Sequence, residues 1–191
     1  VVNTHVINGS SAANGGAFYI NSGIRYLTIS DCSFENNNAK GTGGAIYANG
    51  NGQDIKITDS VFNANSAYGG GAIQFAAGSA YYNNIDIINS NFTNNKDLAS
   101  NNWGGSAIGV NKATDVNIQD SRFDSNVARS NGAVIFDLCS DVVFNACNFT
   151  NNNVTKSAGA VYFANIREGK DKSVSFENCV FINNIAELDA G

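Results

Sequence analysis

Recurring carboxylates are the first residues in this sequence that could do chemistry. Asp31, Asp59 and Asp120 each stand three residues before a Phe, and hydrolysis of a glycosidic bond requires two carboxylates about 5 to 9.5 Å apart. Further copies of the same pattern carry other residues at this position, namely Asn89, Ala146 and Asn178. Such a position is typical of a turn, so we predict no catalytic residue and no enzymatic activity.

Few other residues could carry acid–base or metal chemistry. His5 is the single histidine, and we expect it in a structural position that faces inward. Asp54, Asp59 and Asp86 are isolated, and no run resembles a Gly- and Asp-rich calcium-binding repeat. No Cys-x-x-Cys pair or Cys/His cluster indicates zinc. The sequence therefore predicts no bound metal and no cofactor.

The cysteines and the Asn-x-Ser/Thr sequons mark possible covalent modification. Cys147 and Cys179 fall on adjacent copies of the pattern, but their side chains would be parallel in an in-register stack, which favours free thiols over a disulfide. The sequons predict candidate N-glycosylation sites at Asn8, Asn91, Asn148 and Asn153. Asn91 and Asn148 precede a Phe that we expect to face inward, so glycans there would point away from the core.

The composition narrows the range of partners. The net charge is -5, and the 11 Lys and Arg residues are scattered singly, so no basic stripe exists to neutralise phosphates and we expect no nucleic-acid partner. No apolar run approaches the roughly 20 residues of a membrane-spanning helix, and no signal peptide stands at Val1. We therefore expect no transmembrane segment in this stretch.

One repeating unit must position all of these residues. In its clearest copy, an alternating strand ends at Phe62, Asn65 follows, and a Gly-Gly-Ala-apolar segment ends at Ile73. The unit recurs about every 26 to 32 residues, with alternation of period two and no helical pattern. This predicts an all-β, right-handed parallel β-helix of about six to seven rungs, in which residues 1–191 form one segment of a longer solenoid.

Equivalent residues of successive rungs should form columns along the solenoid axis. We expect the Phe column and a column of small Ser and Cys residues two positions earlier to face inward. We expect the Asn column to turn inward at a corner, in left-handed backbone, where stacked amides bond to one another. A gapless alignment of the first rung places Ile7 in the Phe column and His5 in the Ser/Cys column. The Asn column comprises Asn37, Asn65, Asn95, Asn126, Asn152 and Asn184.

The Gly-Gly-Ala-apolar segment predicts a strip of side chains that face outward. Alternation sends the Ala outward together with the residue two positions later, at Tyr19, Tyr47, Gln74, Gly109, Ile135 and Tyr162. Two interpretations fit its aromatic bias. Tyr suits strands and half-covers its neighbours, or the strip receives a glycan, another chain or a covering segment. Tyr19, Tyr47, Gln74, Ile135 and Tyr162 are therefore the candidate interaction strip.

The paired signatures resemble known surface proteins. F-x-x-N, as in Phe34 to Asn37, and G-G-A-I, as in Gly43 to Ile46, resemble the repeats of chlamydial polymorphic membrane proteins. The Asn-rich, proline-free style is also similar to adhesin-like β-helix proteins of methanogenic archaea. The resemblance implies an extracellular, cell-surface location and a role in adhesion to a protein or glycan on another surface.

These observations leave three hypotheses for function. The leading one is a non-enzymatic, adhesin-like β-helix of the cell surface that presents an extended face for attachment to cells, glycans or partner proteins. The alternative is a self-assembling structural subunit of an extracellular sheath, fibre or surface layer, whose partners are neighbouring copies of itself. A carbohydrate-active enzyme is the third, and it lacks an evident acid/base pair.

Overall fold

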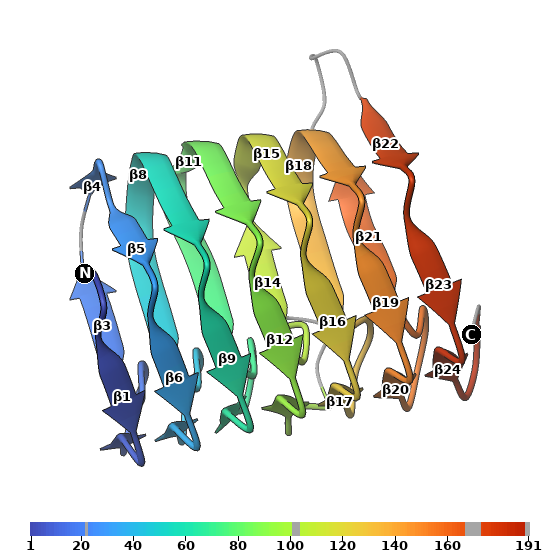
Figure 1. Cartoon of the computed structure of the whole chain (residues 1–191), viewed down its shortest axis with the longest axis horizontal. Helices are drawn as coiled ribbons and strands as arrows, with labels where there is room; N and C mark the ends of the chain where they lie inside the picture. Colours follow the sequence, from blue (N-terminus) through green and yellow to red (C-terminus); the bar gives the residue numbers. More distant parts are fainter. Residues whose placement is uncertain (22, 101–103, 167–172, 190–191) are drawn as a thin grey trace.

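The protein is an all-β parallel solenoid. The computed structural model describes residues 1–21, 23–100, 104–166 and 173–189, and within these ranges every named element is a β-strand. The strands form three parallel sheets that we call A, B and C, and each rung passes through them in that order. Figure 1 shows the rungs stacked side by side, with the two termini at opposite ends of the stack. The predicted fold class is confirmed.

Sheets B and C each contain seven short strands, one from each rung. Sheet B comprises β1 (His5–Ile7), β6 (Ser33–Glu35), β9 (Val61–Asn63), β12 (Asn91–Thr93), β16 (Arg122–Asp124), β19 (Asn148–Thr150) and β23 (Val180–Ile182). Sheet C comprises β2 (Ser10–Ser11), β7 (Asn38–Ala39), β10 (Ser66–Ala67), β13 (Lys96–Asp97), β17 (Val127–Ala128), β20 (Asn153–Val154) and β24 (Ile185–Ala186).

Sheet A is larger, and its long strands curve over the upper edge of the molecule in Figure 1. It comprises β3 (Phe18–Asn21), β4 (Ile24–Arg25), β5 (Thr28–Ser30), β8 (Ile46–Thr58), β11 (Ile73–Ile88), β14 (Ile108–Asn111), β15 (Ala113–Gln119), β18 (Val134–Asn145), β21 (Val161–Ile166) and β22 (Val174–Glu177). The bend contains residues with positive φ, such as Asp54 and Asn84. It separates an outward strip on one side of the molecule from sheet B on the other.

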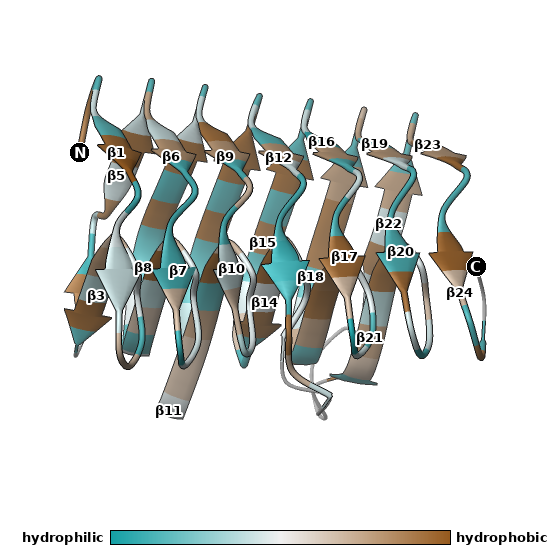
Figure 2. Cartoon of the chain, turned by 90° about the horizontal axis from the view of Figure 1, so that it is seen from below, coloured by the Kyte–Doolittle hydropathy of each residue, from teal (hydrophilic) through white to brown (hydrophobic). Residues whose placement is uncertain are grey.

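The Phe column is the main ladder of the core. Rings from Phe34 to Phe181 stack in parallel with centroids 4.7 to 5.1 Å apart, which matches the spacing of neighbouring strands. Phe34, Phe62, Phe92, Phe123 and Phe149 are fully buried, and burial of each contributes about 1.5–3 kcal/mol. Figure 2 shows the alternation of apolar and polar residues along the strands that produces this inner face.

The Asn column forms a continuous amide ladder inside the solenoid. Asn65 Nδ2 donates to Asn95 Oδ1 at 3.0 Å and to the Phe34 carbonyl at 2.9 Å, and its own Oδ1 accepts from the Asn37 amide. The pattern recurs from Asn37 to Asn184. One detail of the prediction is wrong, because the left-handed residue is the one before each ladder Asn, such as Asn36 or Ala64. The kink at that residue turns the following Asn inward.

The recurring carboxylates occupy turns, as predicted. Asp31, Asp59 and Asp120 have φ of 53°, 50° and 49°, and their counterparts Asn89 and Ala146 have 47° and 52°. Asp and Asn tolerate this left-handed backbone better than most residues. The position therefore serves the corner between sheets A and B.

The first rung differs from the prediction by one residue. Val6, rather than Ile7, pairs with Phe34, and His5 pairs with Ser33. Ile7 is 54% exposed, and the His5 Nδ1 lies 2.7 Å from the Ser33 hydroxyl on the outer face. The reason is loop length: the loop after Ser11 is one residue longer than the loop after Ala67, so a gapless alignment shifts the first strand and exchanges its two faces.

The cysteine thiols are free, in agreement with the stacked arrangement. Cys147 donates to the Ile118 carbonyl at 3.3 Å, and burial raises the pKa of this thiol to about 11. Cys139 is buried at the bend, and burial raises its pKa to about 12. Neither thiol is therefore activated as a nucleophile.

Candidate functional site

The candidate interaction strip forms one outward ladder on the first halves of the sheet A strands. Tyr19 pairs with Tyr47, and the register continues through Gln74, Gly109, Ile135 and Tyr162. The five predicted strip residues therefore do lie in one line along the solenoid. Their exposure differs, and it divides the strip into parts.

Tyr19 and Tyr47 form a stacked pair at the N-terminal part of the strip. Their rings are nearly parallel, 10° apart, with centroids separated by 5.4 Å. Tyr19 is 52% exposed, and Tyr47 is half-buried. Burial and the neighbouring Tyr19 raise the pKa of Tyr47, while a hydrogen bond to the Thr42 side chain opposes this. We call this pair the tyrosine plate.

The middle of the strip is covered. Gln74 is 4% exposed and Ile135 is 2% exposed, so neither offers an open contact surface. The Gln74 side chain lies across Gly109, where an added Cβ would be 2.2 Å from its Oε1. Its Nε2 donates to the Phe75 carbonyl at 3.2 Å, and its Oε1 has no hydrogen-bond partner in the described part of the chain. Gly109 thus provides the space in which this amide lies flat.

A hollow of about 260 Å³ opens next to the plate because Gln74 leans away from it. We call it the strip hollow, and its lining residues are Thr42, Tyr47, Gln74, Ala76, Ala77 and Asn111. Tyr19 covers one face of the Tyr47 ring. Since most lining residues come from later rungs, the opposite face of Tyr47 borders the hollow. The arrangement offers an aromatic face beside amide and hydroxyl groups.

The predicted outward position of the Ala column is wrong. Ala45, Ala72 and Ala107 are fully buried and belong to the hydrophobic core cluster. The preceding turn explains this, since Gly43 and Gly70 have φ of 68° and 61° and simple strand alternation does not extend back through such a turn. The strip therefore has no flanking row of outward-facing alanines.

The four sequons lie away from the strip, on sheets B and C and the corner between them. Asn8, Asn91, Asn148 and Asn153 are all exposed. Asn91 and Asn148 align in one outward column through Arg122, so a glycan on either would leave both the core and the tyrosine plate undisturbed. Glycosylation at these residues stays a prediction.

The described residues contain no group of three or more His, Cys, Asp or Glu side chains that could hold a metal ion. Within the same ranges, no helix is long and apolar enough to cross a membrane.

Sequence reasoning missed a second recess at the bend of sheet A. This corner hollow has a volume of about 430 Å³ and is lined by Gly23, Ile24, Arg25, Asn51, Gly52, Gln53, Tyr81 and Asn83. Arg25, Gln53 and Asn83 occupy one register position on three neighbouring strands. Counting two residues back from the aligned apolar residues Leu27, Ile55 and Ile85 would have revealed this polar column.

Comparison with known proteins finds one family of repeats that part of the chain matches. Residues 31–49 match the Chlamydia polymorphic membrane protein (Chlamydia_PMP) repeat, and they contain both Phe34 with Asn37 and the Gly43 to Ile46 segment. Comparison with curated proteins and with solved structures returned no match. The chain is therefore a parallel β-solenoid repeat protein similar to the Chlamydia polymorphic membrane protein repeat.

Proposed function

We propose that this chain is a non-enzymatic β-solenoid of the cell surface that attaches to another surface through the tyrosine plate. The observation that carries the proposal is the stacked Tyr19 and Tyr47 pair on an outward sheet face, with the strip hollow beside it. Exposed aromatic rings are frequent anchors of binding interfaces because they provide a large rigid contact area together with a polar end. The similarity to the Chlamydia polymorphic membrane protein repeat supports an extracellular location.

The fold suits such a role because it fixes the plate in place. The strands that carry both tyrosines are paired in parallel register, and the amide ladder and Phe stack connect each rung to the next. A partner protein or glycan would therefore meet a preformed surface, with little loss of conformational freedom on binding.

Bead adhesion tests the proposal. Beads coated with the 191-residue chain are applied to cultured animal cells, and the chain is compared with the double variant Tyr19→Ala, Tyr47→Ala. Tyr68→Ala is the matched control, because Tyr68 is 53% exposed and Tyr19 is 52% exposed, while Tyr68 lies outside the strip. We expect the double variant to lose retention by about tenfold or more and the control to retain it. Equal loss in the control would reject the plate, and release of sugars from polygalacturonate would reject the non-enzymatic assignment.

A second candidate is a self-assembling subunit, in which exposed side chains of a rung contact another molecule. On β23, Phe181 and Ile182 are 47% and 50% exposed, and Ile185 on β24 is 55% exposed. The strand edge and these side chains are open to a further rung, from this chain or from another molecule. Filaments or a concentration-dependent series of oligomers in sedimentation velocity would favour assembly, whereas a monomer that binds cells would favour attachment.

A further inference from the structure

We propose that the corner hollow binds a saccharide that carries a carboxylate, with Arg25 as the anion-binding residue. The corner hollow is separate from the tyrosine plate, so this inference does not depend on the attachment proposal. It rests on the charge of Arg25, which has no partner among the described residues, on the hydrogen-bonding groups beside it, and on the shape of the recess.

Arg25 is a cation without a partner among the residues that the structure describes. It is exposed on β4, and its side chain makes no ion pair or hydrogen bond with any described residue. The carboxylate of Asp54, at the same bend, already accepts hydrogen bonds from Gln53 Nε2 at 3.1 Å and from Asn84 Nδ2 at 2.7 Å. In a chain with net charge -5, the Arg25 guanidinium is therefore available to an external anion. Its fork of N–H donors matches a carboxylate.

The neighbouring amides provide both kinds of hydrogen-bonding group. Gln53 uses its Nε2 on Asp54, which leaves its Oε1 as an acceptor. Asn83 uses its Oδ1 to accept from the Thr114 hydroxyl at 2.7 Å, which leaves its Nδ2 as a donor. A sugar hydroxyl both donates and accepts. A donor and an acceptor beside a guanidinium therefore suit a ligand that combines hydroxyls with one carboxylate.

The shape of the recess favours a saccharide over an extended peptide. The β8 backbone at Gln53 is paired on both sides, with Arg25 and with Asn83, so recognition in the middle of the hollow falls to side chains rather than to strand addition. Gly52 forms part of the floor, where an added Cβ would lie 2.8 Å from the Tyr82 ring. The half-buried Tyr81 lines the hollow, and an aromatic ring suits the apolar face of a pyranose. The volume of about 430 Å³ lies in the range of small-ligand sites.

Titration of the isotope-labelled chain, followed by nuclear magnetic resonance, tests ligand class and location together. The probes are trigalacturonate and 3′-sialyllactose, and their neutral counterparts are fully methyl-esterified trigalacturonate and lactose. We expect at least one acidic probe to bind, with its neutral counterpart weaker by about tenfold or more. The largest amide shifts should fall on Gly52, Gln53 and Asn83.

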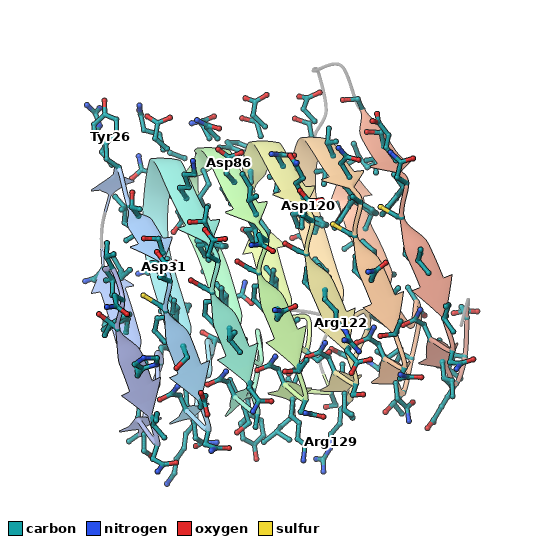
Figure 3. The ribbon with its side chains drawn as sticks, in the orientation of Figure 1. Tyr26, Asp31, Asp86, Asp120, Arg122 and Arg129 are labelled. Atoms are coloured by element: carbon teal, nitrogen blue, oxygen red, sulfur yellow. The ribbon has the colours of Figure 1, made fainter. Side chains whose placement is uncertain are left out.

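Two variants with the same charge change identify the anion-binding residue. Arg25→Gln removes the proposed contact, and Arg122→Gln is the control, because the Arg122 side chain is 55% exposed and faces Asp124 at 3.4 Å on β16. Figure 3 places Arg122 toward the lower part of the molecule, whereas Tyr26, next to Arg25 in sequence, lies at the upper edge. We expect the affinity for the acidic probe to fall by about tenfold or more in Arg25→Gln and by less than about twofold in Arg122→Gln.

Three results would overturn the inference. They are absence of binding by both acidic probes at about 10 mM, equal loss in the two Arg variants, and shifts that map to the tyrosine plate instead of the bend. Thermal unfolding of both variants verifies that they fold. The double variant Tyr19→Ala, Tyr47→Ala should bind the acidic probe normally, so failure of the attachment proposal and failure of this one are distinguishable.

Discussion

The carboxyl group of Asp97 should make the stability of the solenoid depend on pH. Asp97 is 1% exposed and occupies a column whose neighbours are Ala67, Ala128 and Val154. Burial raises its pKa to about 6, although hydrogen bonds from the Ala99 amide and the Ser130 hydroxyl oppose the shift. The usual value in an unfolded chain is about 3.9. Protonation is therefore more favourable in the folded state than in the unfolded state.

The direction of the effect follows from linkage. The folded pKa is the higher one, so the stabilising effect of protonated Asp97 is full below about pH 4 and is lost as the pH rises through about 6. The shift of about two pKa units corresponds to roughly 3 kcal/mol. Between about pH 4.5 and pH 7.5, about 2 kcal/mol of this contribution should be lost. Other carboxyls act in the opposite direction, such as Asp124, whose pKa is lowered.

Asp97→Asn isolates this contribution. In this variant the side-chain oxygen can still accept from the Ala99 amide, as Asp97 Oδ1 does at 2.9 Å. The side-chain NH2 group can donate to the Ser130 hydroxyl, and that hydroxyl can then donate to the Gly104 carbonyl, which lies 3.3 Å away. Urea unfolding by circular dichroism should give the variant and the parent similar free energies of unfolding near pH 4.5. Near pH 7.5 the variant should be more stable by about 2 kcal/mol. The exposed Asp115→Asn serves as control, and a difference for Asp97→Asn that is independent of pH would refute the reasoning.

Two further substitutions test the packing of the rungs. Asn95→Ala should lower the free energy of unfolding by about 3 kcal/mol or more, because the amide and Nδ2 of Asn65 both lose their acceptor; the exposed Asn91→Ala should change it by less than about 0.5 kcal/mol. Urea unfolding measures both, and equal effects would contradict the ladder. Gly44→Ala should destabilise by about 1–3 kcal/mol or more, because its Cβ would lie 2.0 Å from the Gly71 carbonyl oxygen. Gly78→Ala, where the Cβ meets open space, should be neutral or slightly stabilising in thermal unfolding, and a similar loss there would argue against steric contact in Gly44→Ala.

The fold could be predicted because, in a parallel solenoid, residues that are one sequence repeat apart are also in contact in space. Residues one rung apart are direct neighbours across a strand pair, so the recurrence of Phe62 and Asn65 specifies both the ring stack and the amide ladder. No comparable rule covers the loops. The loop after Ser11 has one additional residue, so a gapless alignment is shifted by one position in the first strand. That alignment placed His5 and Ile7 on the wrong faces.

The candidate site was harder to predict, because the exposure of a side chain depends on how it and its neighbours lie on the surface, which the repeat pattern does not specify. Alternation correctly placed Tyr19, Tyr47 and Gln74 in one outward column. It could not indicate that Gln74 would lie across Gly109 and become buried. The corner hollow, in contrast, had a usable signal in the column of Arg25, Gln53 and Asn83.

Exceptions within the columns separate structural residues from candidate binding residues. Asp97 interrupts a column of small residues, but both of its oxygens have partners in the chain, which indicates a structural role. Arg25 stands at the end of a column that continues with the uncharged polar residues Gln53 and Asn83, and it has no such partner among the described residues. Gln74 follows the two stacked tyrosines in the strip, and its Oε1 has no partner among the described residues. Arg25 lines the corner hollow and Gln74 lines the strip hollow, whereas Asp97 lines neither. In a repeating column, a residue that differs from its neighbours and has a polar group without a partner among the described residues is therefore the feature that points to a ligand.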